Sequence, residues 1–407
     1  METQEMIFRV AGELAVTTTV SGQNRPFSQS PQNRKIVKKL PPELRKRKPA
    51  VEGKTPWYRR LLIRLQNDSQ FLRSTVQAAF VLLCIWIGIE FALFVRWGSS
   101  GGQTHFVPRP PGAEGFLPIS SLMGLVYWIR TGIVNGVHPA GFFIFVAIAL
   151  IGLFLKKAFC SWLCPVGTLS ESLHLLGKRL FGRNIQLPRW LDYPLRSLKY
   201  LLFSFFLFSI LQLDIPSLRA FIYSPYNKMA DVKMYLFFSE ISTFAVWTII
   251  ILMLLSLFIK NFWCRYLCPY GAFLGALSWL SPLKITRNKT TCIDCELCTR
   301  ACPANIQIHQ KGRIWSDECT NCLACVAVCP VKETLEVRAA SCSRRIPEWV
   351  LGALIVGTFV AVTGLGIILG RWNTEMQKEE YLIRFQRLDS PLYQHNHGQV
   401  PEYGPND

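Results

Sequence analysis

Eight cysteines between residues 292 and 329 have a spacing that suits iron-sulfur chemistry. They form two runs that both read C-x2-C-x2-C-x3-C-P, with Cys292, Cys295, Cys298 and Cys302 in the first and Cys319, Cys322, Cys325 and Cys329 in the second. A cubane [4Fe-4S] cluster needs four thiolates that converge on one small volume. A tight loop with two-residue gaps directs three of them at that volume, and the fourth comes from elsewhere in the chain.

The fourth ligand of each cluster is expected from the other run. The spacing is that of the bacterial two-cluster ferredoxin, in which the last cysteine of each run ligates the other cluster. Cross-ligation joins the two halves and keeps the clusters close enough for electrons to pass between them. The expected ligands are Cys292, Cys295, Cys298 and Cys329 for cluster 1, and Cys319, Cys322, Cys325 and Cys302 for cluster 2.

Other uses of these thiols agree less well with the sequence. Zinc ribbons usually split their cysteines into two distant pairs, whereas these are two tight quartets. Disulfides need an oxidising compartment, and the charge pattern of the chain places this segment in the cytoplasm. Cys84 and Cys342 stand alone and are expected to be small buried or partly buried side chains.

Four further cysteines lie in two copies of a C-x3-C-P sequence, "FCSWLCPVG" and "WCRYLCPYG". The copies belong to a longer repeat with an offset of 104 residues, in which Lys156 matches Lys260 and Phe159 matches Trp263. The repeated unit is an apolar helix, a basic residue, the cysteine turn and an amphipathic helix. The sequence therefore predicts an internally duplicated helical core.

Each C-x3-C-P copy is predicted to be a corner between two helices, because proline disfavours helical geometry before it and suits the first turn after it. Cys160 and Cys264 would close membrane helices. Cys164 and Cys268 would cap the next helices, whose N-termini favour thiolates. If the two halves pack as pseudo-symmetric partners, all four thiols converge. Three uses are open: a third metal or cluster site, a redox-active dithiol, or plain packing.

Long apolar segments position these cysteines. Half of the 407 residues are hydrophobic, and they are bunched into runs near or above the length of about 20 residues that crosses hydrocarbon. The helix after the first corner carries a one-sided row of leucines, namely Leu169, Leu173, Leu176 and Leu180. The five predicted crossings are Val76–Val95, Pro139–Leu155, Tyr200–Leu213, Ile241–Ile259 and Trp349–Gly370.

The formal net charge of +19 fits a membrane topology better than a nucleic-acid surface. Residues 1–70 hold 14 Lys and Arg against 6 Asp and Glu, and residues 157–199 hold seven against two, whereas 98–138 holds only Arg109, Arg130 and Glu114. Cytoplasmic loops carry such an excess of basic residues. We therefore expect a multi-pass protein of the bacterial inner membrane with no nucleic-acid partner. Its N-terminus and cysteine runs would be cytoplasmic, and the tail after Arg371 external.

The predicted fold is an α-helical polytopic membrane protein with a small α+β two-cluster ferredoxin domain. The stretch "IQIHQKGRIWSDECTNC" favours a strand, a turn at "KG" and another strand. The predicted parts are a basic cytoplasmic arm (1–73), a duplicated transmembrane core with both corners (74–283), the cytoplasmic ferredoxin domain (284–340), a fifth transmembrane helix (346–370) and a short external tail (371–407).

The paired corners followed by two ferredoxin runs resemble the membrane polyferredoxins, a family that includes NapH and the C-terminal half of NosR. The stretch "RPPGAEGFLPISSLMGL" is also similar to this group. The resemblance covers about residues 75 to 340. It implies a membrane electron carrier that exchanges electrons with quinol and relays them through clusters to a partner protein. The fifth crossing and the tail resemble more distantly the CcoG group of oxidase-assembly and copper-reducing proteins, although this tail is too short for the external domain expected there.

The resulting hypothesis is an electron carrier between the quinone pool and an unidentified redox partner, and its status as an enzyme is open. The alternatives are a metal-handling or oxidase-assembly factor that binds or reduces copper, and a redox-sensing membrane regulator. Glu90 lies within the first apolar run and is a candidate for proton uptake beside a quinone, or for an interfacial pairing with Arg96. His138 and His174 are candidate haem or quinone contacts, with packing as the usual role of a lone histidine.

Overall fold

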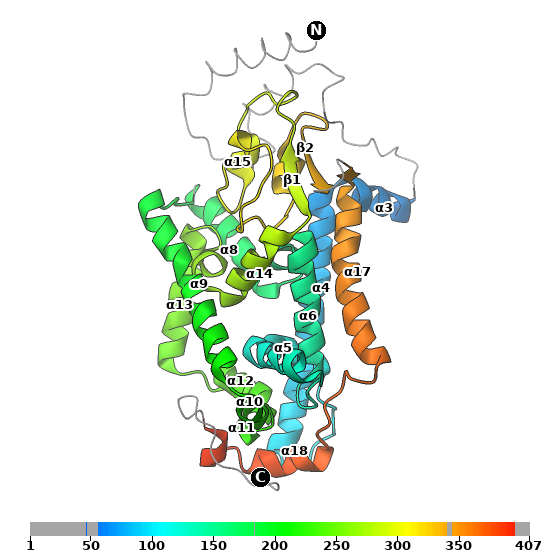
Figure 1. Ribbon diagram of the computed structural model, residues 1–407, viewed down its shortest axis with the longest axis vertical. Coiled ribbons are helices and arrows are strands. Elements are labelled where there is room, and N and C mark those ends of the chain that lie inside the picture. Colours follow the sequence, from blue (N-terminus) through cyan, green and yellow to red (C-terminus); the bar gives the residue numbers. More distant parts are fainter. Residues whose placement is uncertain (1–45, 47–55, 183, 340–343, 395–407) are drawn as a thin grey trace. The chain divides into compact units, whose positions relative to one another are not determined.

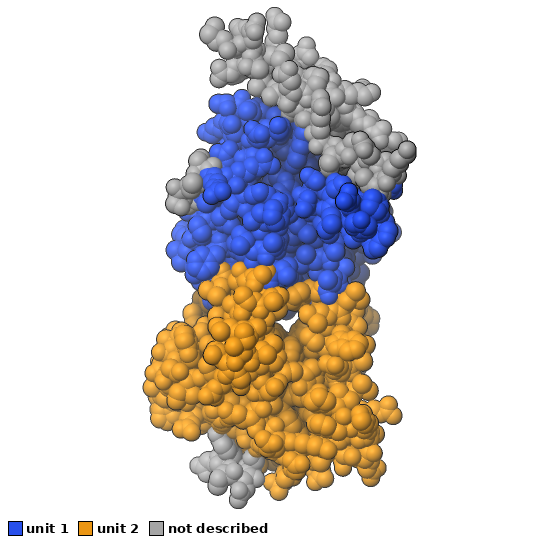
Figure 2. Space-filling view, turned by 90° about the vertical axis from the view of Figure 1, so that its right-hand side faces the viewer, with its two compact units in different colours: residues 1–79, 151–199, 252–356 blue, residues 80–150, 200–251, 357–407 orange. Residues whose placement is uncertain are grey.

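The chain folds into two compact units that alternate along the sequence. Unit 1 comprises residues 1–79, 151–199 and 252–356, and unit 2 comprises 80–150, 200–251 and 357–407 (Figure 2). This computed structural model describes residues 46, 56–182, 184–339 and 344–394. Most of the predicted N-terminal arm, Cys342 and the end of the tail lie outside them. The chain passes between the units inside five helices: α4 (Ser69–Ser99), α6 (Pro139–Leu155), α9 (Arg189–Gln212), α13 (Thr243–Phe258) and α17 (Glu348–Ile368).

Three of these helices, α4, α9 and α17, are long and apolar enough to cross a membrane. A fourth candidate is the pair of α12 (Ala230–Ser239) and α13, which passes the same test together but is bent by 83°. Helix α6 is apolar but only 17 residues long. The described residues therefore form a mostly helical protein with three to four candidate spans, and the predicted number of five crossings stays a prediction.

The cysteine runs lie in a small α+β region of unit 1, in which α15 lies beside β1 and β2 (Figure 1). Strands β1 (Leu283–Arg287), β2 (Leu335–Ala339) and β3 (Arg345–Ile346) form an antiparallel sheet in the order β1-β2-β3. Leu283 pairs with Ala339 and Arg287 with Leu335. The region's helical turns are α15 (Leu297–Ala301), η4 (Ile308–Gln310) and α16 (Ala324–Val328).

The strand pair predicted around the "KG" turn does not form. Residues Ile308–Gln310 are a 3-10 turn instead, and Arg313 makes an isolated antiparallel bridge to Thr286 of β1. The Ile314 N–H donates to the Ile285 carbonyl at 2.9 Å. The polar groups after the turn are thus satisfied by β1, and the segment closes the sheet edge without a hairpin of its own.

Both corners are breaks between helices, as predicted, but the first cysteine of each lies beyond the long helix. Helix α6 ends at Leu155, and Cys160 belongs to the short helix α7 (Phe159–Trp162). Helix α13 ends at Phe258, and Cys264 lies in the π-helical turn η3 (Trp263–Leu267). Lys156 and Asn261 have φ angles of 61° and 53°, a left-handed geometry that ends a helix. Cys160 and Cys264 therefore do not close the long helices.

The second cysteine of each corner is an N-cap. Cys164 precedes α8 (Pro165–Phe181), Cys268 precedes α14 (Pro269–Leu280), and proline occupies the first helical position of both. The Cys268 sulfur accepts a hydrogen bond from the Gly271 N–H at 3.4 Å. Cys164 and Cys268 thus cap the helices that follow them, as predicted.

Helix α8 exposes apolar side chains and buries polar ones, the reverse of the pattern in a water-soluble protein. Its leucine face is open, with Leu169, Leu176 and Leu180 exposed by 48%, 45% and 64%. Its buried residues are instead Ser170, His174 and Gly177. An open apolar face is what a helix in contact with lipid requires, and the buried polar face brings hydrogen-bonding groups to the interior of unit 1.

Unit 2 has its own core, to which the tail contributes. The core combines α4 residues with residues of α12 and of the tail helix α18 (Lys378–Gln386). The described part of the tail is therefore folded into the core of unit 2. Unit 2 also contains η2 (Pro111–Phe116), α5 (Pro118–Thr131), α10 (Ile215–Ile222), α11 (Pro225–Lys228) and η5 (Pro391–Tyr393).

Candidate iron-sulfur sites

Each predicted set of four cysteines lines a cavity of its own. The first cavity is lined by Cys292, Cys295, Cys298 and Cys329, which we call quartet 1. The second is lined by Cys302, Cys319, Cys322 and Cys325, which we call quartet 2. Each cavity thus takes three cysteines from one run and the last cysteine of the other run. Ligation of a cluster by each quartet stays a prediction.

The two cysteine loops have the same backbone geometry. Asp294 and Asn321, two residues after the first cysteine of each run, have φ angles of 46° and 51°. Glu296 and Leu323, two residues further on, have φ angles of 57° and 60° and precede the short helices α15 and α16. Left-handed residues other than glycine are costly. Their repetition at equivalent positions indicates that the loops are shaped to turn their thiols inward.

The surroundings of the thiols fit an iron-sulfur cluster once the thiols lose their protons. Burial raises the pKa of Cys295 to about 11 and that of Cys302 and Cys329 to about 12, so the unligated thiols are neutral. Iron binds thiolates, and its charge offsets this cost. Among the described residues, no three His, Cys, Asp or Glu side chains are already arranged around a metal position. The fit rests on four thiols at each cavity and on its otherwise largely apolar lining, which includes Ile293, Leu297 and Val331 in the first.

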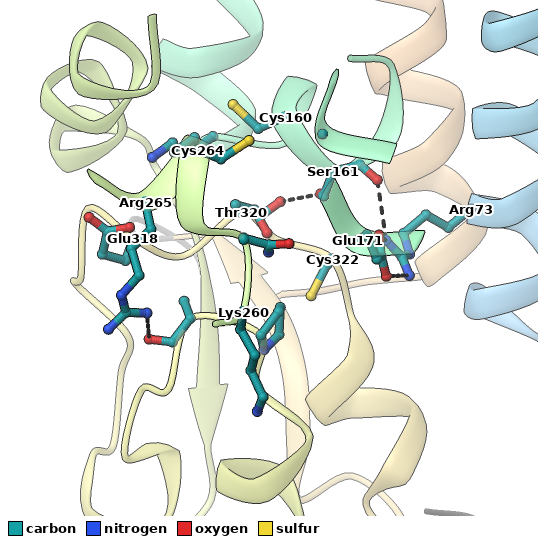
Figure 3. Close-up of a pocket in the computed structure, with 15 residues that line it drawn as sticks. Arg73, Cys160, Ser161, Glu171, Lys260, Cys264, Arg265, Glu318, Thr320 and Cys322 are labelled. Atoms are coloured by element: carbon teal, nitrogen blue, oxygen red, sulfur yellow. Dashed lines mark hydrogen bonds and ion pairs between the residues drawn. The ribbon is translucent and has the colours of Figure 1, made fainter. Parts of the chain in front are cut away.

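The four corner cysteines lie in the same part of unit 1, within range of electrostatic interaction. Cys264 interacts electrostatically with Cys268, Cys164 and Cys160, and Figure 3 shows the sulfur atoms of Cys160 and Cys264 close together. Helix N-termini were expected to favour thiolates here. In the unligated protein burial raises the pKa of Cys268, despite the hydrogen bond from Gly271 and the charge of Lys157, and the metal affinity of this thiol stays a prediction. Burial likewise raises the pKa of Cys160 to about 12.

A third cavity, which we call the corner pocket, extends from the corners to quartet 2 (Figure 3). Its lining residues include Cys160, Cys264 and Cys322. Its charged lining residues are four cations and two carboxylates, namely Arg73, Lys157, Lys260, Arg265, Glu171 and Glu318. A pocket with this excess of positive charge suits an anionic occupant.

Hydrogen bonds tie both corners to loops of quartet 2. From corner 1 (residues 156–167), the Ser161 hydroxyl donates to the Thr320 carbonyl at 2.7 Å, and the Trp162 indole donates to the Asn321 carbonyl at 3.2 Å. From corner 2 (residues 260–271), Arg265 donates to the Ala304 carbonyl at 2.9 Å. The accepting carbonyls belong to the loop of Cys319 and Cys322 and to the loop after Cys302, so quartet 2 is the one next to the corners.

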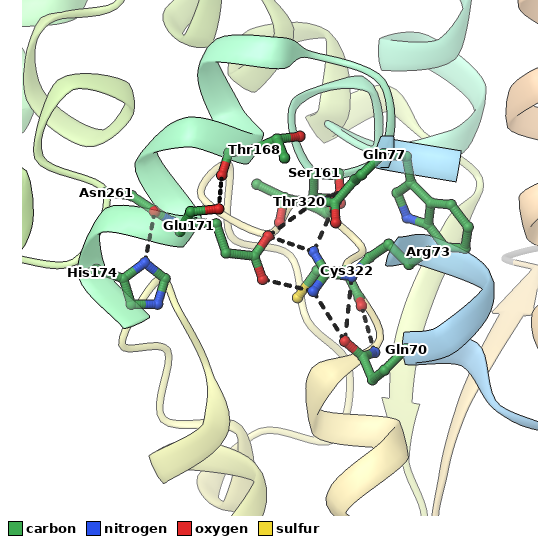
Figure 4. Close-up of polar contacts among 12 residues, drawn as sticks. Gln70, Arg73, Gln77, Ser161, Thr168, Glu171, His174, Asn261, Thr320 and Cys322 are labelled. Atoms are coloured by element: carbon green, nitrogen blue, oxygen red, sulfur yellow. Dashed lines mark hydrogen bonds and ion pairs between the residues drawn. The ribbon is translucent and has the colours of Figure 1, made fainter. Parts of the chain in front are cut away.

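A polar network on α8 lies beside the same quartet (Figure 4). Arg73 of α4 makes two hydrogen bonds of 2.6 Å to Glu171, and Gln77 donates to Glu171 at 3.1 Å. The Gln70 amide donates to the Cys322 carbonyl at 3.0 Å. The buried polar face of α8 thus joins α4 and corner 1 to the quartet 2 loop.

The remaining predicted candidates are not part of these cavities. Glu90 is half-buried on α4 in unit 2, and its proposed role in proton uptake stays a prediction. The Nδ1 of His174 lies 3.2 Å from the Asn261 amide oxygen, and a haem or quinone contact of this histidine stays a prediction. Cys84 is half-buried on α4, as expected for a small side chain.

Sequence reasoning missed a buried ionic cluster in unit 2. Arg109 forms ion pairs with Asp231 and, at 2.7 Å, with Glu114, and both carboxylates are fully buried. Arg109 also lies 3.0 Å from His138 Nδ1, and His138 Nε2 lies 2.7 Å from the Asn227 carbonyl. With Nδ1 accepting from Arg109, the His138 proton must be on Nε2. The arginine and glutamate of "RPPGAEGF" were the available signal, but nothing in the sequence pointed to Asp231.

Comparisons with protein families match both groups of cysteines. The 4Fe-4S dicluster domain matches residues 284–330, which contain both quartets. The 4Fe-4S binding domain matches residues 137–184 and 241–288, two segments with the predicted offset of 104 that contain the corners. The site and the fold therefore define a polyferredoxin-type protein with 4Fe-4S binding domains and candidate membrane helices.

The chain belongs to the family of the "Putative electron transport protein YccM" of Escherichia coli, with which it is 42% identical over 81% of this chain and 92% of that protein. It is also similar to the "Regulatory protein NosR" of Pseudomonas aeruginosa, with 31% identity over 44% of this chain and 24% of that protein. The "Protein NirI" of Paracoccus denitrificans is 33% identical over 48% of this chain and 29% of its own length. No solved structure matches this chain significantly.

Proposed function

We propose that this protein is a membrane-bound electron carrier that relays electrons between the quinone pool and a partner redox protein through two [4Fe-4S] clusters. The main support is that each predicted quartet lines its own cavity. A bound cluster supplies one-electron chemistry, which suits a carrier between a two-electron quinol and a partner protein. Quartet 1 and quartet 2 are the proposed ligands.

The hydrogen bonds from the corners favour an order within this relay. Both corners contact loops of quartet 2, and the corner pocket reaches Cys322 of the same quartet. Quartet 2 is therefore the proposed neighbour of the membrane core. Quartet 1 is the proposed exchange point for the partner protein, and Cys292 and Cys295 are only half-buried there.

The corner cysteines are proposed as a third redox site. This rests on the electrostatic interaction of Cys264 with Cys160, Cys164 and Cys268, and on the match of a 4Fe-4S binding domain to both corners. It also rests on Lys157, a buried cation that interacts electrostatically with Cys160 and Cys268. A thiolate-bound metal centre is anionic and would be compensated by such a cation.

The proposed membrane arrangement has five crossings, through α4, α6, α9, α13 and α17. Its support is the alternation of basic and non-basic loops and the apolar character of these helices. The N-terminus and the ferredoxin region would be cytoplasmic and the tail external. Glu90 keeps its proposed role in proton uptake near a quinone.

Iron and acid-labile sulfide per chain test the cluster content. Anaerobically purified protein should hold about eight irons if only the two quartets are loaded, and about twelve if the corners bind a further [4Fe-4S] cluster. Protein that is colourless and free of iron would contradict the whole proposal.

The double variant Cys164→Ser/Cys268→Ser separates the corners from the quartets. Loss of about four irons with the spectra of the other clusters unchanged would support a third cluster, whereas an unchanged iron count would exclude one. Cys84→Ser is the matched control. Copper bound in the native protein and lost from the variant would favour the metal-handling alternative.

Reduction by quinol tests whether the quinone pool supplies electrons to the clusters. A short-chain quinol added to the native protein in lipid nanodiscs should bleach the cluster absorbance, and the effect should weaken in Glu90→Gln if this carboxylate takes up the proton. Clusters that dithionite reduces but no quinol does would contradict the link to the quinone pool.

A further inference from the structure

The two sequence repeats each place one lysine against the same quartet. Lys156 and Lys260 are equivalent in the repeat, and each follows the end of a long apolar helix. The Lys156 ammonium donates to the Ser316 carbonyl at 3.0 Å, three residues before Cys319. The Lys260 ammonium reaches the Cys302 carbonyl at 3.4 Å and the Asn305 amide oxygen at 3.3 Å. Both contacted loops contribute a cysteine to quartet 2.

In the part of the chain that the structure describes, neither Lys156 nor Lys260 forms an ion pair, although the charge of Asp317 acts on Lys156. Lys156 is fully buried and Lys260 is half-buried. The ion pairs of this region involve other cations, such as Arg73 with Glu171 and Lys199 with Glu318. A desolvated ammonium that meets only carbonyl and amide oxygens is incompletely compensated. Negative charge nearby would therefore be stabilised.

The hydrogen bonds to the loops of Cys319 and Cys302 place both ammonium groups near quartet 2, and other charged groups surround them. Burial lowers the pKa of Lys156, and Cys319 and Asp317 oppose this effect while Arg313 adds to it. Burial also lowers the pKa of Lys260, with Cys302 acting against it and Lys178 and Arg265 acting with it. In both cases the first opposing group is a cysteine of quartet 2.

We propose that Lys156 and Lys260, one from each repeat, are a pair of positioning residues that hold the quartet 2 loops against the membrane core and raise the reduction potential of the cluster bound there. This inference rests on the proposed ligation by quartet 2. One-electron reduction adds a negative charge to the cluster, and a fixed cation in a poorly solvated site favours the reduced form. The duplication thus supplies one cation to each of two loops that contribute cysteines to quartet 2.

Quartet 1 has a different arrangement and serves as an internal reference. Its Cys292 sulfur accepts a hydrogen bond from Arg287 at 3.2 Å, and Arg287 is paired with Asp294 at 2.9 Å. Among the described residues, those that line the cavity of quartet 1 include none from either corner. Changes at Lys156 or Lys260 should therefore leave the quartet 1 cluster unaffected.

The test is a redox titration of the full-length holoprotein with dithionite, followed by electron paramagnetic resonance. Lys156→Met and Lys260→Met should each lower the midpoint potential of one cluster signal, and the double variant should lower it further. Lys156→Arg and Lys260→Arg should restore it. The affected signal should be the one that Cys322→Ser abolishes. Lys332→Met, at an exposed surface position beside quartet 1, is the matched control.

The outcomes separate the two proposals. Full iron content with unchanged potentials in both methionine variants would overturn the role of the lysines while leaving the relay intact. Native protein without iron would overturn the relay itself. If a methionine variant loses iron, the Gln variant at the same position is titrated, and it must show the lower potential for the inference to stand. Raised salt should not remove the shift, because buried charges are screened little.

A second observation, independent of the clusters, concerns α3 (Trp57–Asn67). This helix has no buried residue, and Trp57, Tyr58, Leu61 and Leu62 are all exposed. These four residues fall on one side of the helix, whereas Arg59, Arg60 and Arg64 fall on the other, and the helix contains no acidic residue. It ends two residues before α4, which is long and apolar enough to span a membrane.

We infer that α3 lies on the membrane surface and binds anionic phospholipid. An exposed apolar face beside three arginines complements acyl chains and anionic headgroups, and continuity with α4 keeps the helix at the bilayer. The test places the photo-crosslinker benzoylphenylalanine at Leu61 of the full chain in nanodiscs of phosphatidylglycerol and phosphatidylcholine. Lipid adducts detected by mass spectrometry should form from Leu61 and not from Gln66. Equal adducts from both positions, or adducts to protein only, would contradict the inference.

Discussion

Arg73 and Glu171 form a two-pronged ion pair, in which each terminal nitrogen of the guanidinium lies 2.6 Å from a different carboxylate oxygen. The pair connects α4 to α8, the helix that follows corner 1. Their side chains are exposed by only 8% and 22%. The pair therefore holds the buried polar face of an otherwise apolar helix beside quartet 2.

Arg73→Met should destabilise unit 1 because it leaves the Glu171 carboxylate without its cation. Breaking a fully buried pair costs about 3 to 5 kcal/mol, and the partial exposure of Glu171 reduces the expected loss to about 2 to 3 kcal/mol. The measurement is the temperature at which the cluster absorbance is lost. Arg64→Met, on the exposed helix α3, should change it little. Equal effects from both substitutions would show that the pair contributes nothing specific.

The same pair predicts a pH dependence. Burial tends to raise the pKa of Glu171, but the hydrogen bonds and charge of Arg73 outweigh it, so that the folded-state pKa lies below the ordinary value of 4.5. A lowered folded pKa means stability that is fully present above pH 4.5 and is lost as the pH falls through the folded pKa. The difference in melting temperature between native protein and Glu171→Gln should thus stay nearly constant at pH values well above 4.5 and shrink below pH 4.5. A difference that grows on acidification would contradict this.

Cross-ligation predicts that replacing the last cysteine of one run removes the cluster held mainly by the other run. Cys302→Ser should remove the cluster of quartet 2, and Cys329→Ser that of quartet 1, because each cavity is lined by the last cysteine of the other run. Each variant should lose about half of the dicluster iron. The decisive comparison is spectroscopic: Cys302→Ser should share its missing signal with Cys322→Ser. If it shares the missing signal with Cys295→Ser instead, each run ligates its own cluster.

Cluster loading should release protons. Burial raises the pKa of Cys302 and Cys329 to about 12, so both thiols are protonated in the unligated protein at neutral pH and must lose a proton to bind iron. Anaerobic reconstitution of the apoprotein in weak buffer should acidify the medium, and loading should be faster at higher pH. Protein whose thiols have been alkylated beforehand is the control and should release none. Loading without acidification would mean that the thiols are already ionised.

The spacing of the cysteines was enough to predict which four line each cavity, because two-residue gaps constrain a short loop strongly. The N-cap positions of Cys164 and Cys268 could also be predicted, because a proline follows each of them. The ends of the long helices could not be predicted. The breaks there involve the left-handed backbone of Lys156 and Asn261, which the sequence does not indicate. The sequence also did not show whether the leucine face of α8 is buried or exposed, because a row of leucines can pack equally well against lipid or protein.

Long-range ion pairs were beyond sequence reasoning altogether. Arg109 and Asp231 are 122 residues apart, and Lys199 and Glu318 are 119 apart. Each partner by itself looks like an ordinary loop or helix-end charge. Only the packing of separate segments makes them neighbours, and no local pattern identifies the partner. The cluster around Arg109 is the most consequential case.

Arg109→Met should destabilise unit 2 more than Arg73→Met destabilises unit 1. It leaves Glu114 and Asp231 buried without their cation, although each also accepts a backbone N–H, from Gly141 at 2.8 Å and from Val232 at 2.9 Å. A loss of about 3 to 5 kcal/mol is expected. Arg130→Met is the matched control, because its guanidinium donates to carbonyls near the surface instead of to carboxylates. Hydrogen exchange of α12 and α18 should rise in the Arg109 variant while α15 and α16 stay protected, and uniform exchange throughout the chain would show that the cluster does not act on unit 2 alone.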